Sequence, residues 1–163
     1  MICKRSPYIT RTNRLADVIA AIQVMGTYKV YKLTFEDWAD RISGDRNQAL
    51  HWRNVFEEHP EFFRLDSKRL CASLVWRRQH QKSWSIDRQA TLSKDEILGL
   101  NGDFTRISRI PLGSDVIAKL METAINLHAR ALEQSSDRRW WIPTVAAFIG
   151  AVLGSVVSLI SAK

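Results

Sequence analysis

The chain of 163 residues has little of what several common protein classes require. It has two cysteines, Cys3 and Cys71, which are too few for a disulfide scaffold or a cysteine-based zinc site. The sequence has no glycine-rich phosphate-binding loop, and its four histidines lack metal-ligand spacing with acids or cysteines. We therefore predict no catalytic residue, no metal and no cofactor, and a protein that is not an enzyme.

Charge is absent from one long segment, because no residue from Trp140 to Ala162 is ionisable. About 20 apolar residues are enough for a helix to cross the hydrocarbon core of a bilayer, so we predict a transmembrane helix over residues 140–162. The alternative is a buried C-terminal helix of a soluble fold, for which so short a chain offers little surrounding core. The residues expected at the membrane interface are Arg138, Arg139, Trp140 and Trp141.

The predicted span has a direction and a pattern. Basic residues precede it, so the positive-inside rule predicts an inner (cytoplasmic) membrane protein with a cytoplasmic N-terminus and a C-terminal anchor. Small residues recur every four positions and predict a face for self-association, and hence a homo-oligomer, although small residues are also common in membrane helices generally. These residues are Ala146, Gly150, Gly154 and Ser158.

Four segments follow from charge and pattern: a basic domain over 1–82, a partly structured connector over 83–113, an amphipathic helix over 114–139 and the span over 140–162. Residues 1–82 have a net charge of +6, whereas the net charge of residues 83–141 is zero. Within the connector, Ser93 and Glu96 have the spacing of a capping box, which predicts a short helix to about Leu98.

The first half of the chain shows helical periodicity. Apolar residues three and four positions apart from Leu15 to Met25 predict a helix with Asn13 as its N-cap. A short strand is expected over 28–33. Thr34 then begins a second helix with acids in its first turn, and Asp45 caps a third helix that is predicted from 46 to 59.

The pattern then changes from helical to alternating. Residues 63–65 predict one short strand, 66–68 a turn, and 69–77 a second strand with one buried face. The order helix, strand, helix, turn, helix, hairpin resembles a winged helix-turn-helix domain over about residues 12–78. The expected fold class is therefore mainly α with a small β-hairpin, winged-helix-like, plus a long C-terminal helix continuing into a transmembrane helix.

The resemblance implies that the third helix is a recognition helix and that residues 64–77 form a wing, elements that in this family commonly contact duplex nucleic acid. Winged helices also bind proteins, and Glu57 and Glu58 make the end of the third helix acidic, so a cytosolic protein and a nucleic acid both stay open as partners. Anionic membrane lipid and a plain solvated face are the remaining interpretations. The candidate partner-binding residues are Arg46, Asn47, His51, Arg53, Arg64, Lys68, Arg69, Arg77 and Arg78.

The helix over 114–139 has a short heptad seam, formed by Ile117, Leu120, Ala124, Leu127 and Ala131. It predicts either a weak coiled coil between chains or a helix packed back on the basic domain.

Together these features predict a membrane-tethered binding or sensing module that captures a protein or nucleic-acid partner and oligomerises through its span. One alternative is a small membrane-disrupting effector, with a layout similar to that of bacterial defence effectors. The other is an accessory subunit of a larger membrane complex.

Overall fold

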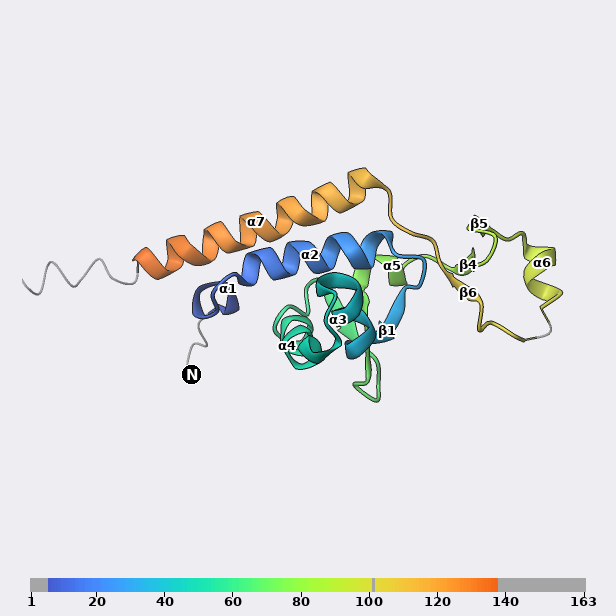
Figure 1. The fold of residues 1–163 in the computed structure, drawn as a ribbon. Coiled ribbons are helices and arrows are strands. Elements are labelled where there is room, and N and C mark those ends of the chain that lie inside the picture. Colours follow the sequence, from blue (N-terminus) through green and yellow to red (C-terminus); the bar gives the residue numbers. More distant parts are fainter. Residues whose placement is uncertain (1–5, 101, 138–163) are drawn as a thin grey trace, which may run out of the picture.

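A computed structural model describes residues 6–100 and 102–137 of the chain. In this part, seven α-helices, one short 3-10 helix and six strands form a mixed α/β fold (Figure 1). The helices are α1 (Pro7–Thr10), α2 (Arg14–Thr27), α3 (Phe35–Ser43), η1 (Arg46–Gln48, 3-10), α4 (Ala49–Glu58), α5 (Val75–Arg78), α6 (Lys94–Leu98) and α7 (Ser114–Asp137). The strands are β1 (Lys32–Thr34), β2 (Phe63–Leu65), β3 (Cys71–Leu74), β4 (Lys82–Ser85), β5 (Ala90–Thr91) and β6 (Ile107–Arg109).

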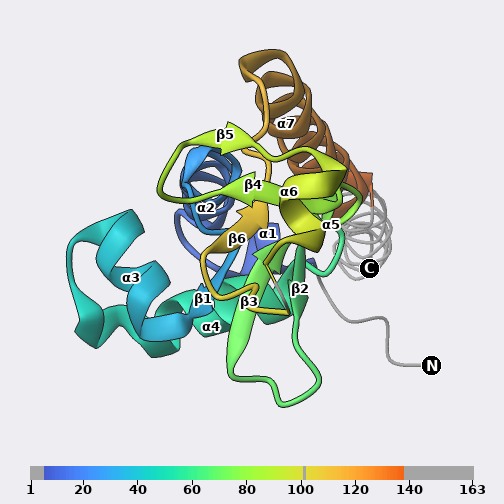
Figure 2. The ribbon, with the colours of Figure 1, turned by 90° about the vertical axis from the view of Figure 1, so that its right-hand side faces the viewer.

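The strands form two antiparallel sheets, with the orders β1–β3–β2 and β5–β4–β6. The first sheet packs with α2, α3 and α4, and its β2–β3 hairpin projects from the body of the molecule (Figure 2). The second sheet and α6 lie beyond the C-terminal end of α2 (Figure 1). The order of elements from α2 to β3 is the order that the sequence predicts.

Local capping agrees with the sequence at three of four predicted positions. Thr34 accepts a hydrogen bond from the backbone of Asp37, and Asp45 accepts one from the backbone of Asn47 and caps η1. Ser93 begins α6 with a complete capping box. Asn13 differs, because it lies in the left-handed region at φ 61° and its side chain makes no capping hydrogen bond.

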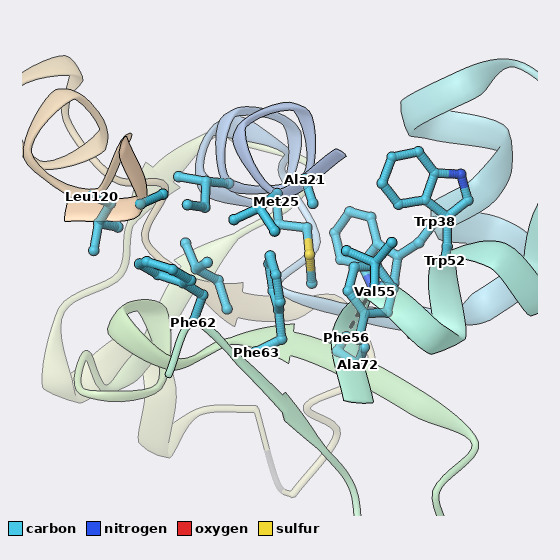
Figure 3. Close-up of a cluster of buried hydrophobic side chains, with 14 of the residues drawn as sticks. Ala21, Met25, Trp38, Trp52, Val55, Phe56, Phe62, Phe63, Ala72 and Leu120 are labelled. Atoms are coloured by element: carbon cyan, nitrogen blue, oxygen red, sulfur yellow. Dashed lines mark hydrogen bonds between the residues drawn. The ribbon is translucent and has the colours of Figure 1, made fainter. Parts of the chain in front are cut away.

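The core lies between α2, α3, α4 and the first sheet (Figure 3). Trp38 is fully buried there and its indole Nε1 donates to the carbonyl oxygen of Ala72 at 2.9 Å, which satisfies the one polar atom of the side chain. Phe56 and Phe63 pack with ring centroids 5.0 Å apart. Each large apolar side chain buried in this way contributes about 1.5–3 kcal/mol to stability.

The long helix α7 packs along α2 (Figure 1). Four of the five seam residues are buried, at positions 117, 120, 124 and 131, and they belong to the main core. A Cβ atom on Gly26 would lie 3.1 Å from Cδ1 and Cγ1 of Ile117, so the absence of a side chain lets the two helices approach closely. The heptad seam of the sequence therefore packs back on the domain.

The expected fold class and membrane anchor are corrected by this structure. No helix within 6–100 and 102–137 is both long and apolar enough to cross a bilayer. The longest, α7, is amphipathic, with an exposed face that carries charges such as Lys119, Glu122 and Arg130. The fold is mixed α/β, so the prediction of a mainly α fold that continues into a transmembrane helix is wrong. The predicted single-pass anchor and inner-membrane localisation are not supported.

The positions on which the anchor prediction rested lie outside the described residues. They are the interface residues Arg138, Arg139, Trp140 and Trp141 and the self-association residues Ala146, Gly150, Gly154 and Ser158.

The second strand of the hairpin is shorter than the alternation predicts. It ends at Leu74, where the chain turns into α5. Leu70, expected on the buried face, is 60% exposed, because its backbone N–H donates to the Asp66 carboxylate and it belongs to the turn. Arg77, expected on the exposed face, is completely buried. The segment predicted as a partly structured connector contains most of the second sheet and α6. The fold therefore has more strand than the sequence predicts.

Candidate functional site

A hollow with a volume of about 690 Å³ lies beside the first sheet. We call it the sheet groove. Its lining comes from β1, the end of α4, the β2–β3 hairpin, α5 and β6. The lining residues are Tyr31, Lys32, Phe56, Glu57, Pro60, Phe63, Arg64, Leu65, Asp66, Ser67, Arg69, Ser73, Arg78 and Arg109.

The register of the sheet places part of this lining on one face. Lys32 and Arg64 both lie opposite Ser73, on the strands that flank β3, so the three side chains share a face. The neighbouring set on the other face, which includes Ala72 and Leu65, packs in or against the core. Alternation along the strands thus separates a basic face from an apolar one.

The groove has an excess of positive charge. Five cationic side chains line it, against the two carboxylates of Glu57 and Asp66. Two of the cations are paired, since Lys32 Nζ lies 3.2 Å from Asp66 Oδ2 and Arg69 Nη2 lies 2.9 Å from Glu57 Oε1. The other three form no ion pair with any residue that the structure describes: Arg64, Arg78 and Arg109.

Both carboxylates of the groove are held in their charged form. The pKa of Glu57 is lowered by hydrogen bonds from Arg53 and Arg69. The pKa of Asp66 is lowered mainly by the backbone N–H of Leu70, with smaller contributions from Cys71 and Lys32. Asp66 therefore orders the hairpin turn, while Glu57 joins the end of α4 to that turn through Arg69.

Arg109 is fixed at the end of the groove. Its Nη1 donates to the carbonyl oxygen of Arg78 at 2.6 Å and also to that of His80. Its Cζ lies 5.1 Å from the ring centroid of Tyr31, within the range of a cation–π contact. Tyr31 is held in turn by its backbone N–H, which donates to Ser108 Oγ at 3.1 Å. These contacts join β6 to the segment before β1.

The structure divides the nine predicted binding residues into groups. Arg64, Arg69 and Arg78 line the sheet groove, and Lys68 is exposed in the adjacent turn. On the helix side, Arg46 and Arg53 pair with Asp37 and Glu57 respectively. His51 Nε2 lies 3.2 Å from Asp17 Oδ2, and Asn47 is exposed in η1. Arg77 lies in the interior and so contributes nothing to the surface.

The sequence did not single out most of the groove lining, and among the residues that it left out are Tyr31, Lys32 and Arg109. Tyr31 and Lys32 lie in a segment predicted only as a strand. Arg109 lies in the predicted connector, 45 positions from Arg64, and no local pattern signals that the second sheet brings it to the groove.

A second group of polar side chains lies where α1, α4 and α7 meet. His59 is 1% exposed, its Nδ1 lies 2.9 Å from Glu61 Oε1, and its ring packs 4.5 Å from that of Tyr8. Neither His59 Nε2 nor the Tyr8 hydroxyl has a hydrogen-bond partner among the described residues. The pKa of Tyr8 is raised by burial and then by the charge of Glu61. Because both rings are buried, this cluster is closed to a ligand.

Metal chemistry finds no support in the part of the chain that is described, where no group of three or more His, Cys, Asp or Glu side chains could hold an ion. The pKa of Cys71 is raised by burial, which disfavours the reactive thiolate.

Comparisons with protein-family models, with curated proteins and with solved structures give no match.

Proposed function

We propose that this protein is a binding module, not a catalyst, and that it holds the phosphate backbone of a nucleic acid in the sheet groove. The observation that supports this most is the set of three arginines, Arg64, Arg78 and Arg109, that line one groove without a carboxylate partner. Arginine presents a planar fork of donors that matches a phosphate group, and such charge-assisted hydrogen bonds are among the stronger ones.

The spread of the cations favours a polymer over a single small anion. Arg69 stands at the turn end of the hairpin, Arg64 at its middle and Arg78 beyond β3. With a rise of about 3.3 Å per strand residue, the four residues of β3 that separate the turn from α5 alone span about 10 Å. A nucleic acid carries negative charges at short regular intervals, so several phosphates can be neutralised along such a row.

The contact proposed here differs from the recognition-helix arrangement of winged helices. Arg46 and Arg53, which would face a major groove, are neutralised by Asp37 and Glu57. Glu58, at the end of α4, pairs with the buried Arg14 and with Arg11. We therefore place the contact on the wing side, where Lys68 extends the basic surface.

The test is a binding titration of the full chain by fluorescence anisotropy, with a labelled single strand and a labelled duplex, at about 50 mM and about 200 mM salt. The double variant Arg64→Glu/Arg78→Glu is expected to bind at least about tenfold more weakly than the wild type. The double variant Lys119→Glu/Arg130→Glu is the matched control, because it makes the same charge change on the exposed face of α7. Binding that is absent at low salt, or lost equally in the control, contradicts the proposal.

A second candidate function is binding of an acidic protein, favoured by two exposed apolar residues. Leu50 is 69% exposed on α4 and Leu70 is 60% exposed in the hairpin turn, on either side of the network formed by Arg53, Glu57 and Arg69. Poly-L-glutamate serves as the probe in the same titration. If it binds as tightly as the nucleic acid, and Arg64→Glu/Arg78→Glu weakens both equally, the acidic-protein candidate is favoured.

A further inference from the structure

The sheet groove contains a flat π-surface beside its unpaired arginines. The ring of Tyr31 and the guanidinium of Arg109 lie 5.1 Å apart, and both residues line the groove. A second cation, Lys82 Nζ, lies 5.8 Å from the same ring centroid. Tyr31 is only partly buried, so part of this surface faces the groove.

Hydrogen bonds hold Arg109 at both its guanidinium and its backbone carbonyl, and none of them involves the Tyr31 side chain. Two backbone carbonyls, those of Arg78 and His80, fix the Arg109 guanidinium. The buried Arg77 in turn donates from Nη2 to the carbonyl oxygen of Arg109 at 2.5 Å. The orientation of the guanidinium is therefore set before a ligand binds, which reduces the entropy lost on binding.

Flat surfaces of this kind bind nucleobases. Every base has a π-face that stacks on aromatic rings and on guanidinium planes, and proteins that bind single strands combine such stacking with a positively charged groove. In a duplex the faces of the bases are already stacked on one another, so they are not available to an aromatic ring. An acidic peptide offers charge but no base.

We propose that the sheet groove takes an unpaired nucleic-acid strand, with one base stacked at the Tyr31–Arg109 pair and neighbouring phosphates held by Arg64 and Arg78. This inference rests on the proposed function and adds the class of nucleic acid. It assigns Tyr31 to base stacking and leaves the backbone contacts to the arginines.

The decisive probe is an abasic strand. A labelled single strand of about 12 nucleotides is titrated into the full chain beside an abasic strand of the same length and charge, and beside the duplex of the same sequence. The wild type is expected to bind the abasic strand and the duplex about tenfold more weakly than the normal strand. Equal affinity for the normal and abasic strands overturns the inference.

Variants of Tyr31 separate stacking from charge. Tyr31→Leu is expected to lower the affinity for the normal strand about tenfold and to leave the affinity for the abasic strand unchanged. Tyr31→Phe keeps an aromatic ring, so its affinity for both strands is expected to equal that of the wild type. If Tyr31→Leu weakens both strands equally, the ring does not stack on a base and the inference fails. The thermal midpoint of unfolding shows whether each variant folds. If Tyr31→Leu does not fold, the comparison of normal and abasic strands on the wild type still tests whether a base is bound.

The outcomes distinguish this inference from the proposed function. Absence of binding to every nucleic acid at low salt contradicts the proposed function itself. Binding that is sensitive to Arg64→Glu/Arg78→Glu, but equal for normal, abasic and duplex probes, leaves the proposed function in place and removes only the unpaired strand. If poly-L-glutamate binds as tightly as the nucleic acid, and Arg64→Glu/Arg78→Glu weakens both equally, the acidic-protein candidate is favoured over both the proposed function and this inference.

Discussion

The guanidinium of Arg77 lies against the C-terminal end of α2, where its Nη1 donates to the carbonyl oxygen of Met25 at 3.0 Å. It also donates to the carbonyls of Tyr28, Arg109 and Ile110. The side chain is completely buried and makes no ion pair with a described residue. A helix C-terminus carries partial negative charge, so these carbonyls stabilise a cation that would otherwise be costly to bury.

Burial lowers the pKa of Arg77 to about 10, which leaves the group charged at neutral pH. Since this one side chain, on α5 directly after β3, joins the end of α2 to the end of β6, it connects the first sheet to the second and so positions the groove pair Tyr31 and Arg109.

Arg77→Met is expected to lower the free energy of unfolding by about 3 kcal/mol, because buried carbonyls lose their donor. The matched control is Arg78→Met at the next position, which is exposed and is expected to change stability by less than about 0.5 kcal/mol. Urea unfolding followed by circular dichroism measures both. Equal effects of the two substitutions would show that Arg77 is not a structural link.

The contact between Gly26 and Ile117 predicts coupling between two substitutions. Gly26→Ala gains helix propensity but forces a methyl group against Ile117, whereas Ile117→Val removes the crowded Cδ1. Ile117→Val is expected to cost about 1 kcal/mol in the wild type and clearly less in the Gly26→Ala background. A double-mutant cycle on unfolding free energies measures this. Additivity within about 0.4 kcal/mol would contradict a close approach of α2 and α7.

The buried hydroxyl of Tyr8 predicts a stabilising substitution. It has no hydrogen-bond partner among the described residues, so Tyr8→Phe removes an unsatisfied polar atom while keeping the ring. The expected gain is up to about 1 kcal/mol. Trp38→Phe is the contrast, because Trp38 has a partner in Ala72 and its replacement is expected to cost about 2 kcal/mol or more. A loss of stability in Tyr8→Phe would indicate that the hydroxyl is bonded.

Glu57 restrains two of the basic residues near the groove, since its Oε1 accepts from Arg53 Nε and lies 2.9 Å from Arg69 Nη2. Glu57→Gln removes a negative charge and releases both arginines, so we expect nucleic-acid binding severalfold tighter at low salt, with a steeper dependence on salt. Glu122→Gln on the exposed face of α7 makes the same charge change as a control. If the two variants bind alike, the α4 end of the groove takes no part in binding.

Stability is expected to fall in acid. Hydrogen bonds to the charged carboxylate lower the pKa of five acids, Glu57, Asp66, Asp87, Glu96 and Asp103. Because the unfolded chain binds these protons more readily, the stabilisation is complete above the ordinary carboxyl pKa near 4 and disappears as the pH falls through the lowered values. The urea midpoint should therefore drop between about pH 5 and about pH 2, and Asp66→Asn should flatten this profile. A urea midpoint that stays constant over this pH range would contradict the prediction.

Short-range signals in the sequence predicted the elements that depend on a few neighbouring residues. The apolar spacing of α2, the cap at Thr34 and the capping box at Ser93 each require contacts within one or two turns of chain. The basic charge of residues 1–82 could also be read directly, and three of the predicted residues, Arg64, Arg69 and Arg78, do line the groove.

Tertiary structure alone decided the rest. Alternation cannot show that β3 ends at Leu74, because Arg77 turns inward only when the carbonyls at the end of α2 and at the end of β6 are in place to receive it. The heptad seam of α7 fits a partner chain or α2 equally well in sequence, and close packing at Gly26 selects α2. Likewise, Tyr31 and Arg109 stand 78 positions apart, and only the docking of the second sheet brings them into one groove.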